Sequence, residues 1–404
     1  MTTKPGPARE GAGATRAWRI LGVLIVAAAT ALAVILVLVL KDHGAPSKEP
    51  RHRRQMTAAR PAGKPFNFCA DRAAVFSGRT PFVGITLGAD YPKRLDCALG
   101  LAAATHLGYV REDLVWATTE PVPGQYDFSS YDAFVAKLAE HHQRVLPLLI
   151  TAPSWDTTAP ASGARPGLYP PASPAQFAQF AAVCVRRYGP HGSFWRAHPK
   201  LPYYPATAWQ VWNEPDLTGN WQPRFSPAAY VRLLRASYKS IKAADPHATV
   251  VTAGFFFATA ALERSILTEL FEAGMAGAFD ALSIHTYSPI QAPLRLELAR
   301  QLMDRFGAAK AQLWSTELAW ASGGPDPWVS DPRSQASAIR SYFGWVARNR
   351  ARLNLRELFW YSLEDNIFGP DPDWWRYHLG LLTTTRQPKP ALAALSAAAA
   401  KLDG

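Results

Sequence analysis

Short apolar runs alternate with amphipathic stretches along the chain from residue 81 to its C-terminus. The amphipathic stretches predict helices, such as 226–244, which opens with a serine and a proline, 334–349, and a closing helix at 390–402. The apolar runs between them predict eight strands, at residues 82–87, 109–113, 144–150, 208–212, 250–255, 281–285, 312–316 and 358–362. Eight strand–helix units in succession predict a (β/α)8 TIM barrel of parallel strands.

An open, doubly wound sheet is the alternative for the same alternation. Such a sheet needs a glycine-rich phosphate-binding turn after its first strand, and the run from Gly84 to Gly88 does not supply one. The pattern therefore favours the barrel. In a barrel the functional side chains collect at the C-terminal ends of the strands.

A long uncharged run precedes the barrel. Residues 20–40 contain no charged side chain and are rich in Leu, Val, Ile and Ala, with Arg16 and Arg19 before them and Lys41 after. At about 1.5 Å per residue this run can cross a hydrocarbon layer of about 30 Å, which predicts a transmembrane signal-anchor helix after a short basic tail, 1–19. A cleaved signal peptide is the alternative, but its apolar run is usually only about 7 to 15 residues long.

Residues 41–64 mix Pro, Gly, Lys, Arg and Ala without an apolar period, which predicts a flexible basic linker. The folded domain is then expected at 65–404. A count of basic residues beside the apolar run favours a cytoplasmic domain, but long domains cross membranes largely regardless of charge. We therefore expect a single-pass protein of the cell membrane, with a cytoplasmic N-terminus and an extracellular domain.

The charge of the chain is unevenly distributed. The net charge is +12, and residues 1–64 carry eleven Lys and Arg against three acidic residues. The full chain is 48% hydrophobic, and its residues after 64 show no basic stripe interleaved with aromatic residues. This pattern indicates a globular domain and argues against a nucleic-acid partner.

The cysteines and histidines predict neither a disulfide framework nor a metal site. Cys69, Cys97 and Cys184 allow one bridge with three possible pairings, and the sequence does not choose among them. Cys97 and Cys184 lie in apolar helical stretches, where we expect small buried side chains. The ten histidines are scattered, apart from His141 and His142, so we expect no metal and no cofactor.

Two glutamates stand where predicted strands end. Glu214 follows the strand at 208–212 in Trp-Asn-Glu-Pro, and Glu317 follows the strand at 312–316 in Trp-Ser-Thr-Glu. Cleavage of a glycosidic bond needs one carboxyl group as an acid and a second as a nucleophile or base. Glutamates at the surface or in ion pairs are the alternative, but an unpaired carboxylate after an apolar run would be costly to bury.

These motifs resemble those of a known group of enzymes. Asn213-Glu214-Pro215 resembles the acid/base motif of retaining glycoside hydrolases of clan A, and Thr316-Glu317 resembles their nucleophile motif. The resemblance covers about residues 81–402 and is nearest to family 39, including its membrane-tethered bacterial exopolysaccharide glycosidases, with family 5 cellulases second. It implies cleavage of β-linked O-glycosidic bonds in a polysaccharide by double displacement, with Glu214 as acid/base and Glu317 as nucleophile.

The resemblance also assigns helpers. Asn213 would bind the sugar 2-hydroxyl, Tyr287 in Ile-His-Thr-Tyr would hold the nucleophile, Arg111 would lie beneath it, and His285 would contact substrate. The alternatives are a turn residue for Asn213, a core histidine for His285 and a structural ion pair for Arg111.

Fourteen tryptophans are many for this length, and indole faces stack on pyranose rings. Trp360 resembles the platform beneath the cleaved sugar, and Trp155 and Trp320 are expected to line the cleft. Core packing is the alternative for each of them.

The sequence leaves several questions open. Leu318 and Ala319 follow Glu317 where relatives often carry an aromatic residue or glycine, so placement in the clan is firmer than placement in the family. A membrane-tethered carbohydrate-binding barrel without turnover and a transglycosidase acting through the same intermediate remain alternatives. We expect a monomer, and the sequence does not identify the sugar or its linkage.

Overall fold

The computed structural model describes residues 66–403 apart from 71, 75–79, 89–93, 162–164, 325–330 and 367–373. The predicted basic tail 1–19, the transmembrane helix 20–40 and the linker 41–64 lie outside the described residues, so they remain predictions. Among the residues that are described, no helix is long and apolar enough to cross a membrane.

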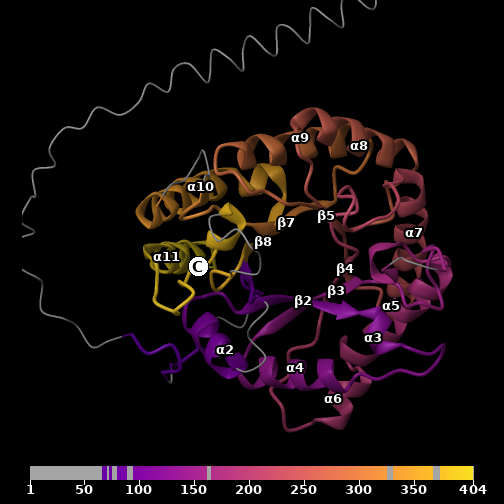
Figure 1. Cartoon of the computed structure of the whole chain (residues 1–404), viewed down its shortest axis with the longest axis horizontal. Helices are drawn as coiled ribbons and strands as arrows, with labels where there is room; N and C mark the ends of the chain where they lie inside the picture. The colour runs from indigo at the N-terminus through magenta and orange to yellow at the C-terminus, as the bar shows by residue number, and fades with distance from the viewer. Residues whose placement is uncertain are drawn as a thin grey trace, which may run out of the picture. The chain divides into compact units, whose positions relative to one another are not determined.

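Eight parallel strands close into a barrel in chain order, with the first strand paired to the last (Figure 1). They are β1 (Val83–Thr86), β2 (Tyr109–Val115), β3 (Arg144–Ile150), β4 (Ala208–Val211), β5 (Thr249–Phe255), β6 (Ala281–Ile284), β7 (Gln312–Leu318) and β8 (Leu355–Tyr361). The predicted barrel is thereby confirmed, and all eight predicted strands are present. The observed strand ends differ from the predicted ones by a few residues. The strands β4 and β6 stop before the polar residues that follow them, whereas β2 and β7 continue past the predicted ends.

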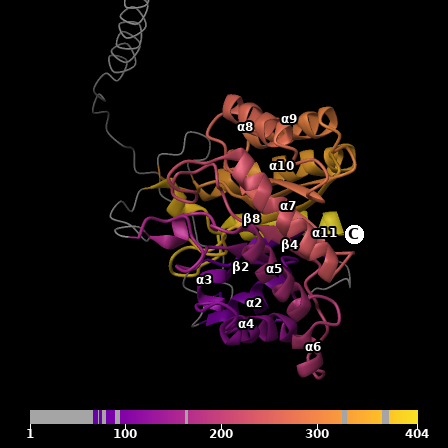
Figure 2. The same cartoon turned by 90° about the vertical axis from the view of Figure 1, so that its right-hand side faces the viewer.

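Helices surround the barrel and cover the outward faces of the strands (Figures 1 and 2). The long ones are α2 (Leu95–Ala104), α4 (Ser129–Glu140), α5 (Pro174–Tyr188), α7 (Pro227–Ala244), α8 (Ala260–Glu272), α9 (Gln291–Arg305), α10 (Pro332–Leu353) and α11 (Pro390–Asp403). Short segments are α3 (Trp116–Thr119), α6 (Ser193–Ala197), η2 (Pro166–Leu168) and η3 (Trp375–His378). Helix α7 begins as the sequence predicts, because the Ser226 side chain accepts a hydrogen bond from the Ala229 amide and Pro227 occupies the first turn.

The base of the barrel is filled by a layer of inward-facing apolar side chains, Tyr109, Leu146, Ala208, Val251, Ala281, Trp314 and Phe359. The strand β1 contributes Gly84 to this layer, where a Cβ atom would lie 2.4 Å from the Phe359 ring. Large rings from the other strands therefore occupy the space that a side chain on β1 would need.

The next inward layer of the barrel is mainly polar. Side chains alternate along a strand, so the residue two positions beyond an inward-facing one also faces inward. Two positions beyond the apolar layer stand Arg111, Gln210, Ser283 and Thr316, all buried. The barrel is thus apolar at its base and polar toward the C-terminal ends of the strands, which is where a site can form.

One cysteine expectation is wrong. Cys69 and Cys97 form a disulfide that joins the segment before β1 to the start of α2, with their Cα atoms 4.5 Å apart. Cys97 is therefore not merely a small buried side chain, because the fold brings it to a residue 28 positions earlier in the chain. Cys184 is free and buried in α5, as expected.

Candidate active site

The carboxyl group of Glu214 is aimed by an unusual turn at the end of β4. Trp212 and Glu214 both have left-handed backbone conformations, with φ of 70° and 40°. Such conformations are costly for residues other than glycine and persist where surrounding contacts impose them. Here the Glu214 amide donates to the Gly254 carbonyl at 3.0 Å, and the Trp212 indole donates to the Asn220 carbonyl at 2.9 Å. The turn holds Glu214 at the mouth of the barrel, where it is nine-tenths buried.

Glu317 is held on β7 by two donors. The Arg111 Nη1 atom lies 2.7 Å from Glu317 Oε1, and the Tyr287 hydroxyl donates to Oε2. Burial raises the pKa of Glu317, but the neighbouring His285 ring, the charge of Arg111 and the hydrogen bond from Tyr287 together outweigh burial and leave the pKa below its ordinary value. Glu317 is therefore held as a carboxylate.

Arg111 on β2 donates hydrogen bonds from three nitrogens, to residues of β4 and its following turn and to Glu317 on β7. Its Nε atom donates to Gln210 Oε1 and its Nη2 atom to Asn213 Oδ1, each at 2.7 Å, while Nη1 binds Glu317. Because a guanidinium group can only donate, Asn213 must present its oxygen to Arg111. The amide NH2 group of Asn213 is then directed away from Arg111 and is available to a ligand.

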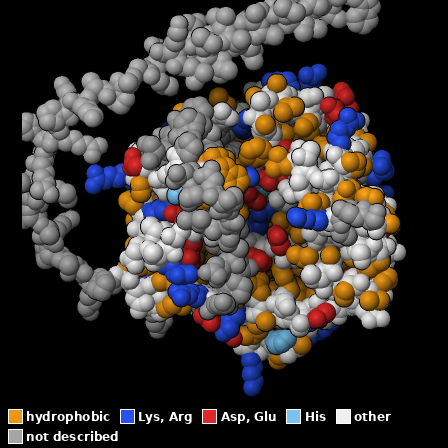
Figure 3. All heavy atoms as spheres, viewed as in Figure 1, with side chains coloured by type: hydrophobic (Ala, Val, Ile, Leu, Met, Phe, Trp, Pro, Cys, Tyr) orange, Lys and Arg blue, Asp and Glu red, His pale blue; other side chains and the backbone are white. Residues whose placement is uncertain are grey.

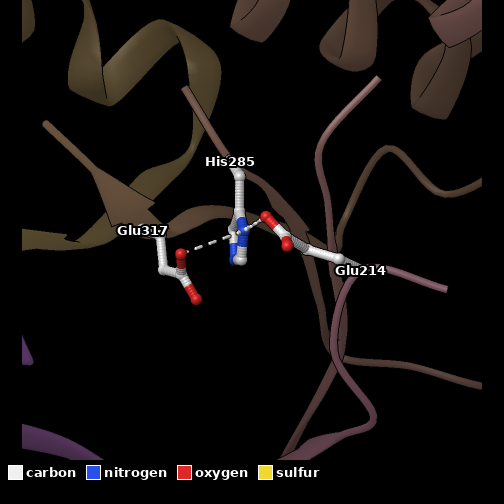
Figure 4. A group of neighbouring side chains, drawn as sticks. All are labelled: Glu214, His285 and Glu317. Atoms are coloured by element: carbon white, nitrogen blue, oxygen red, sulfur yellow. Dashed lines mark hydrogen bonds and ion pairs between the residues drawn. The ribbon is translucent and has the colours of Figure 1, made fainter. Parts of the chain in front are cut away.

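His285 lies between the two glutamates (Figure 4). Its Nδ1 atom is 2.8 Å from Glu214 Oε1 and 3.6 Å from Glu317 Oε2, and its Nε2 atom is 3.0 Å from Thr316 Oγ1. Gly254 on β5 makes room for the ring, since a Cβ atom there would lie 1.8 Å from His285 Nε2. The imidazole therefore contacts both carboxyl groups from one buried position.

A buried chain of hydroxyl groups determines which ring nitrogen of His285 carries the proton. Gln210 Nε2 donates to Thr316 Oγ1 at 2.8 Å, the Thr316 amide donates to Ser283 Oγ at 3.1 Å, and the two hydroxyls are 2.7 Å apart. Every buried hydroxyl proton finds an acceptor when Ser283 donates to Thr316 and Thr316 donates to His285 Nε2. In that arrangement the neutral ring carries its proton on Nδ1 and donates it to Glu214.

A shift in strand register lets two consecutive residues of β7 reach the interior. The pairing between β7 and β8 slips between Ser315 and Leu318. Thr316 can therefore bind His285 while the neighbouring Glu317 binds Arg111. Regular alternation would have placed one of these side chains outside the barrel.

The two glutamates face each other at short range. One oxygen from each carboxyl group and one His285 nitrogen all lie within 4.8 Å of one another. These donor types could bind a divalent cation, but Arg111 already pairs with Glu317 at 2.7 Å and places a positive charge there. The arrangement therefore suits proton transfer and nucleophilic attack better than metal binding.

A cavity of about 430 Å³ opens beside Glu317 and Asn213, within the range of about 300–1,000 Å³ that is usual for ligand sites. Its lining residues come from β1 to β4, β7 and β8 and are Thr86, Gly88, Arg111, Glu112, Asp113, Leu148, Ile150, Asn213, Glu317 and Tyr361. Figure 3 shows a hollow near the centre of the viewed face, with acidic and basic side chains inside it.

Two tryptophans expected at the cleft lie elsewhere. Trp360 and Trp320 are fully buried and pack edge to face with ring centroids 5.2 Å apart, and the Trp360 indole donates to the Leu379 carbonyl. The expected sugar contact of both residues is therefore wrong. Along β8 the inward positions are Phe359 and Tyr361, so Tyr361 lines the cavity instead. Trp155 is half-buried against Trp116, outside the cavity lining.

The structure brings together most of the expected site residues and adds others. Arg111, Asn213, Glu214, His285 and Glu317 form one hydrogen-bonded group that is connected through Gln210 and Thr316, and Tyr287 belongs to it through its hydroxyl. Sequence reasoning missed the supporting residues Gln210, Gly254, Ser283 and Tyr361. A usable signal existed for Gln210 and Ser283, because each is a lone polar residue inside an otherwise apolar strand.

Solved structures similar to this one are glycoside hydrolases. A family 39 glycoside hydrolase from the gut symbiont Bacteroides cellulosilyticus WH2 has a TM-score of 0.60 at 19% identity, over 80% of this chain and 64% of that one. The family 39 enzyme from Xanthomonas axonopodis pv. citri has a TM-score of 0.57 at 20% identity, over 79% and 67%. Xylanase 10B from Thermotoga maritima has a TM-score of 0.55 at 15% identity, over 80% and 96%.

These similarities show a shared barrel fold. The chain spans slightly less than two thirds of the length of the Bacteroides enzyme. No protein-family model and no curated protein matches the sequence.

Proposed function

We propose that this protein is a retaining glycoside hydrolase that cleaves β-linked O-glycosidic bonds in a polysaccharide, with Glu214 as acid/base and Glu317 as nucleophile. The observation that carries the proposal is the pair of facing carboxyl groups on β4 and β7, with oxygens within 4.8 Å. Retaining enzymes place their carboxyl groups about 5–5.5 Å apart, whereas inverting enzymes need about 6.5–9.5 Å to admit water. The short gap supports retention.

The proposed reaction follows from the contacts of each group. The Glu317 carboxylate attacks the anomeric carbon, the bond from that carbon to the leaving oxygen breaks, and Glu214 gives its proton to the oxygen. Water then attacks the glycosyl ester while Glu214 takes its proton, which releases the sugar and restores Glu317. Arg111 and Tyr287 stabilise the departing carboxylate, and His285 orients Glu214.

The remaining residues at the mouth suit a sugar. The amide NH2 group of Asn213 can donate to a ring hydroxyl, in line with its proposed contact to the 2-hydroxyl, and Tyr361 on β8 lines the cavity and can offer an aromatic ring to a sugar. Two similar structures are β-xylosidases from Caulobacter crescentus. Sugar identity and the choice between terminal and internal cleavage depend on loops around this mouth.

A panel of 4-nitrophenyl β-glycosides and bacterial polysaccharides tests the proposed activity. We expect release of nitrophenol or reducing ends, reduced about 10²- to 10⁴-fold by Glu214→Gln and at least as much by Glu317→Gln. Glu297→Gln, a surface glutamate paired with Arg352, is the matched control and should be active. If the parent protein binds polysaccharide but hydrolyses none, the carbohydrate-binding alternative is correct.

Product stereochemistry tests the mechanism separately from the activity. Proton NMR during the first turnovers should show the β-anomer as the initial product of a β-glycoside. A 2-fluoro glycosyl fluoride should label Glu317, found by mass spectrometry of the digested protein. An initial α-anomer would contradict retention while leaving hydrolysis intact.

We further propose that residues 20–40 anchor the protein in the cell membrane with the barrel outside the cell. The disulfide between Cys69 and Cys97 supports this side, because disulfides persist in oxidising compartments. Protease added to intact cells should digest the barrel. A soluble cytoplasmic protein of the same cells should stay whole, which shows that the cells have not been opened. A barrel that resists protease until the cells are opened would reverse the orientation.

A further inference from the structure

An arginine near the nucleophile is surrounded by aromatic rings. The Arg376 guanidinium carbon, in η3 after β8, lies 5.8 Å from the Phe256 and Tyr287 ring centroids, 5.5 Å from Trp374 and 5.6 Å from Trp375. Each distance is within the range of about 6 Å for a cation–π contact. We call these four rings the Arg376 cage.

The Arg376 cage adjoins the proposed reaction centre. Tyr287 belongs to both, since its ring contacts Arg376 while its hydroxyl donates to the Glu317 carboxylate. Tyr361, which lines the cavity, packs 6.4 Å from Tyr287, and the charge of Arg376 lowers the Tyr361 pKa against the larger effect of burial. Arg376 is therefore joined to the Glu317 carboxylate through Tyr287, and to the cavity through the Tyr361 ring that Tyr287 contacts.

The hydrogen-bonding capacity of Arg376 is unused by the part of the chain that the structure describes. None of those residues accepts a hydrogen bond from Arg376 or pairs with it as an acid, although the side chain is half-buried. A guanidinium group has five N–H donors in its plane, and aromatic carbon atoms cannot replace the oxygen acceptors that these donors prefer. A planar edge of this kind matches a carboxylate or a sulfate.

The charged residues around the mouth of the barrel are acidic on one side and include Arg376 on the other. Glu112 and Asp113 line the cavity on the β2 side, whereas Arg376 follows β8. An anionic substituent on a bound sugar would be repelled by the first side and attracted by the second. A neutral sugar could accept hydrogen bonds from this guanidinium group but would lack the attraction between opposite charges.

We propose that Arg376 is a specificity-determining residue that binds an acidic substituent of the substrate, which makes the substrate an acidic polysaccharide. The shared chemistry is an oxyanion on the sugar with two oxygens that can accept adjacent N–H donors, either the carboxylate of a uronic acid or a sulfate ester. This inference rests on the proposed glycosidase function and deepens it.

Matched aryl glycosides test the inference on the full-length protein. The substrates are 4-nitrophenyl β-D-glucuronide, β-D-glucoside and β-D-glucoside 6-sulfate, with the same three forms in the galacto series. We expect the parent to prefer an acidic form over its neutral partner, and Arg376→Gln to lower kcat/KM for the acidic form about 10- to 100-fold more than for the neutral one. Preference for uronide or for sulfate identifies the source of the oxyanion.

Two further variants separate recognition from folding. Arg376→Lys keeps the charge without the planar edge and should give an intermediate loss. Arg305→Gln is the matched control, since Arg305 also covers an aromatic ring, at 5.5 Å from Phe306, but lies at the far end of α9. An equal loss on acidic and neutral substrates in Arg376→Gln, or a parent that prefers the neutral forms, would overturn the proposal.

A binding experiment keeps this test independent of turnover. Calorimetry on the Glu317→Gln variant compares oligouronates with neutral oligosaccharides of equal length. Tighter binding of the acidic ligand, lost when Arg376→Gln is added and weakened by salt, supports the acidic subsite even if no substrate of the panel is hydrolysed. Equal binding of both ligands contradicts the subsite, whether or not hydrolysis is seen.

Discussion

Gly254 on β5 and His285 after β6 fit together because Gly254 has no side chain. A Cβ atom at Gly254 would lie 1.8 Å from His285 Nε2, and the Gly254 carbonyl also accepts the amide proton of Glu214. One backbone position thus supports both the imidazole and the turn that carries the proposed acid. Glycine is required here for close approach and not for a left-handed conformation.

Gly254→Ala should therefore displace His285 and abolish most of the activity. We expect kcat/KM to fall about 10²-fold or more, as for a misplaced catalytic group. Gly344→Ala is the control, because a Cβ atom in that position of α10 would meet Arg348 at an ordinary 3.6 Å. That control should be as active as the parent and about 0.5–1 kcal/mol more stable in thermal denaturation. Full activity of Gly254→Ala would show that His285 has no part in the reaction.

Tyr287→Phe should slow formation of the glycosyl-enzyme and leave binding largely unchanged. The hydroxyl donates to Glu317 and stabilises its carboxylate, so its loss is expected to lower kcat about 10- to 100-fold through a lost charge-assisted hydrogen bond. Pre-steady-state release of nitrophenol measures this step. Tyr342→Phe is the control, since its ring packs on Trp320 outside the barrel. A change in KM alone would contradict the assigned role.

The pH dependence of kcat/KM should report Glu317. Its pKa lies below the ordinary glutamate value because His285, Arg111 and Tyr287 outweigh burial, so the group stays ionised as the pH falls toward and below about 4.3. Activity that needs this carboxylate is lost only when the pH falls through the lowered pKa. Arg111→Met removes one of the stabilising charges and should move the acidic limb to higher pH.

The same shift contributes to stability. A carboxyl group with a depressed pKa in the folded state stabilises the fold above its unfolded pKa, and this stabilisation disappears as the pH falls through the folded pKa. The parent should therefore lose more stability than Arg111→Met between about pH 5 and the folded pKa of Glu317. Parallel stability curves for the two proteins in acid would contradict the ion pair.

Thr316→Val tests the proton arrangement of His285. Valine has nearly the shape of threonine but cannot donate to His285 Nε2, so the ring is free to place its proton on Nε2 and cease donating to Glu214. We expect about a 10-fold loss of kcat with an altered basic limb of the pH profile, as for a modest loss of acid catalysis. Thr316→Ser keeps the hydroxyl and should recover most of the activity. Equal losses in both variants would indicate a packing role.

The disulfide between Cys69 and Cys97 should stabilise the start of the domain. Cross-links of this kind typically contribute about 2–4 kcal/mol. Cys69→Ser with Cys97→Ser should lower the melting temperature, and a reductant should lower the parent to the same value while leaving the double variant unchanged. Cys184→Ala is the control. It keeps the disulfide, so a reductant should lower its melting temperature by as much as it lowers that of the parent.

The sequence alone determined the barrel and its two glutamates. Strand and helix periods are local properties, so eight alternations could be counted directly, and Glu214 and Glu317 follow from short motifs at strand ends. The position of a side chain relative to other strands is not local. It depends on register, and the slip between β7 and β8 brings both Thr316 and Glu317 to the interior.

Only the tertiary structure decided which aromatic residue faces the cavity and which groups support the glutamates. Trp360 and Tyr361 are adjacent in the sequence, and the barrel turns one outward and the other inward, since neighbouring side chains on a strand lie on opposite faces. Gly254 matters because His285, which follows another strand, packs against it, and Cys97 matters because it forms a disulfide with Cys69, outside its own helix. Contacts between distant segments depend on the closed fold, which composition and periodicity do not encode residue by residue.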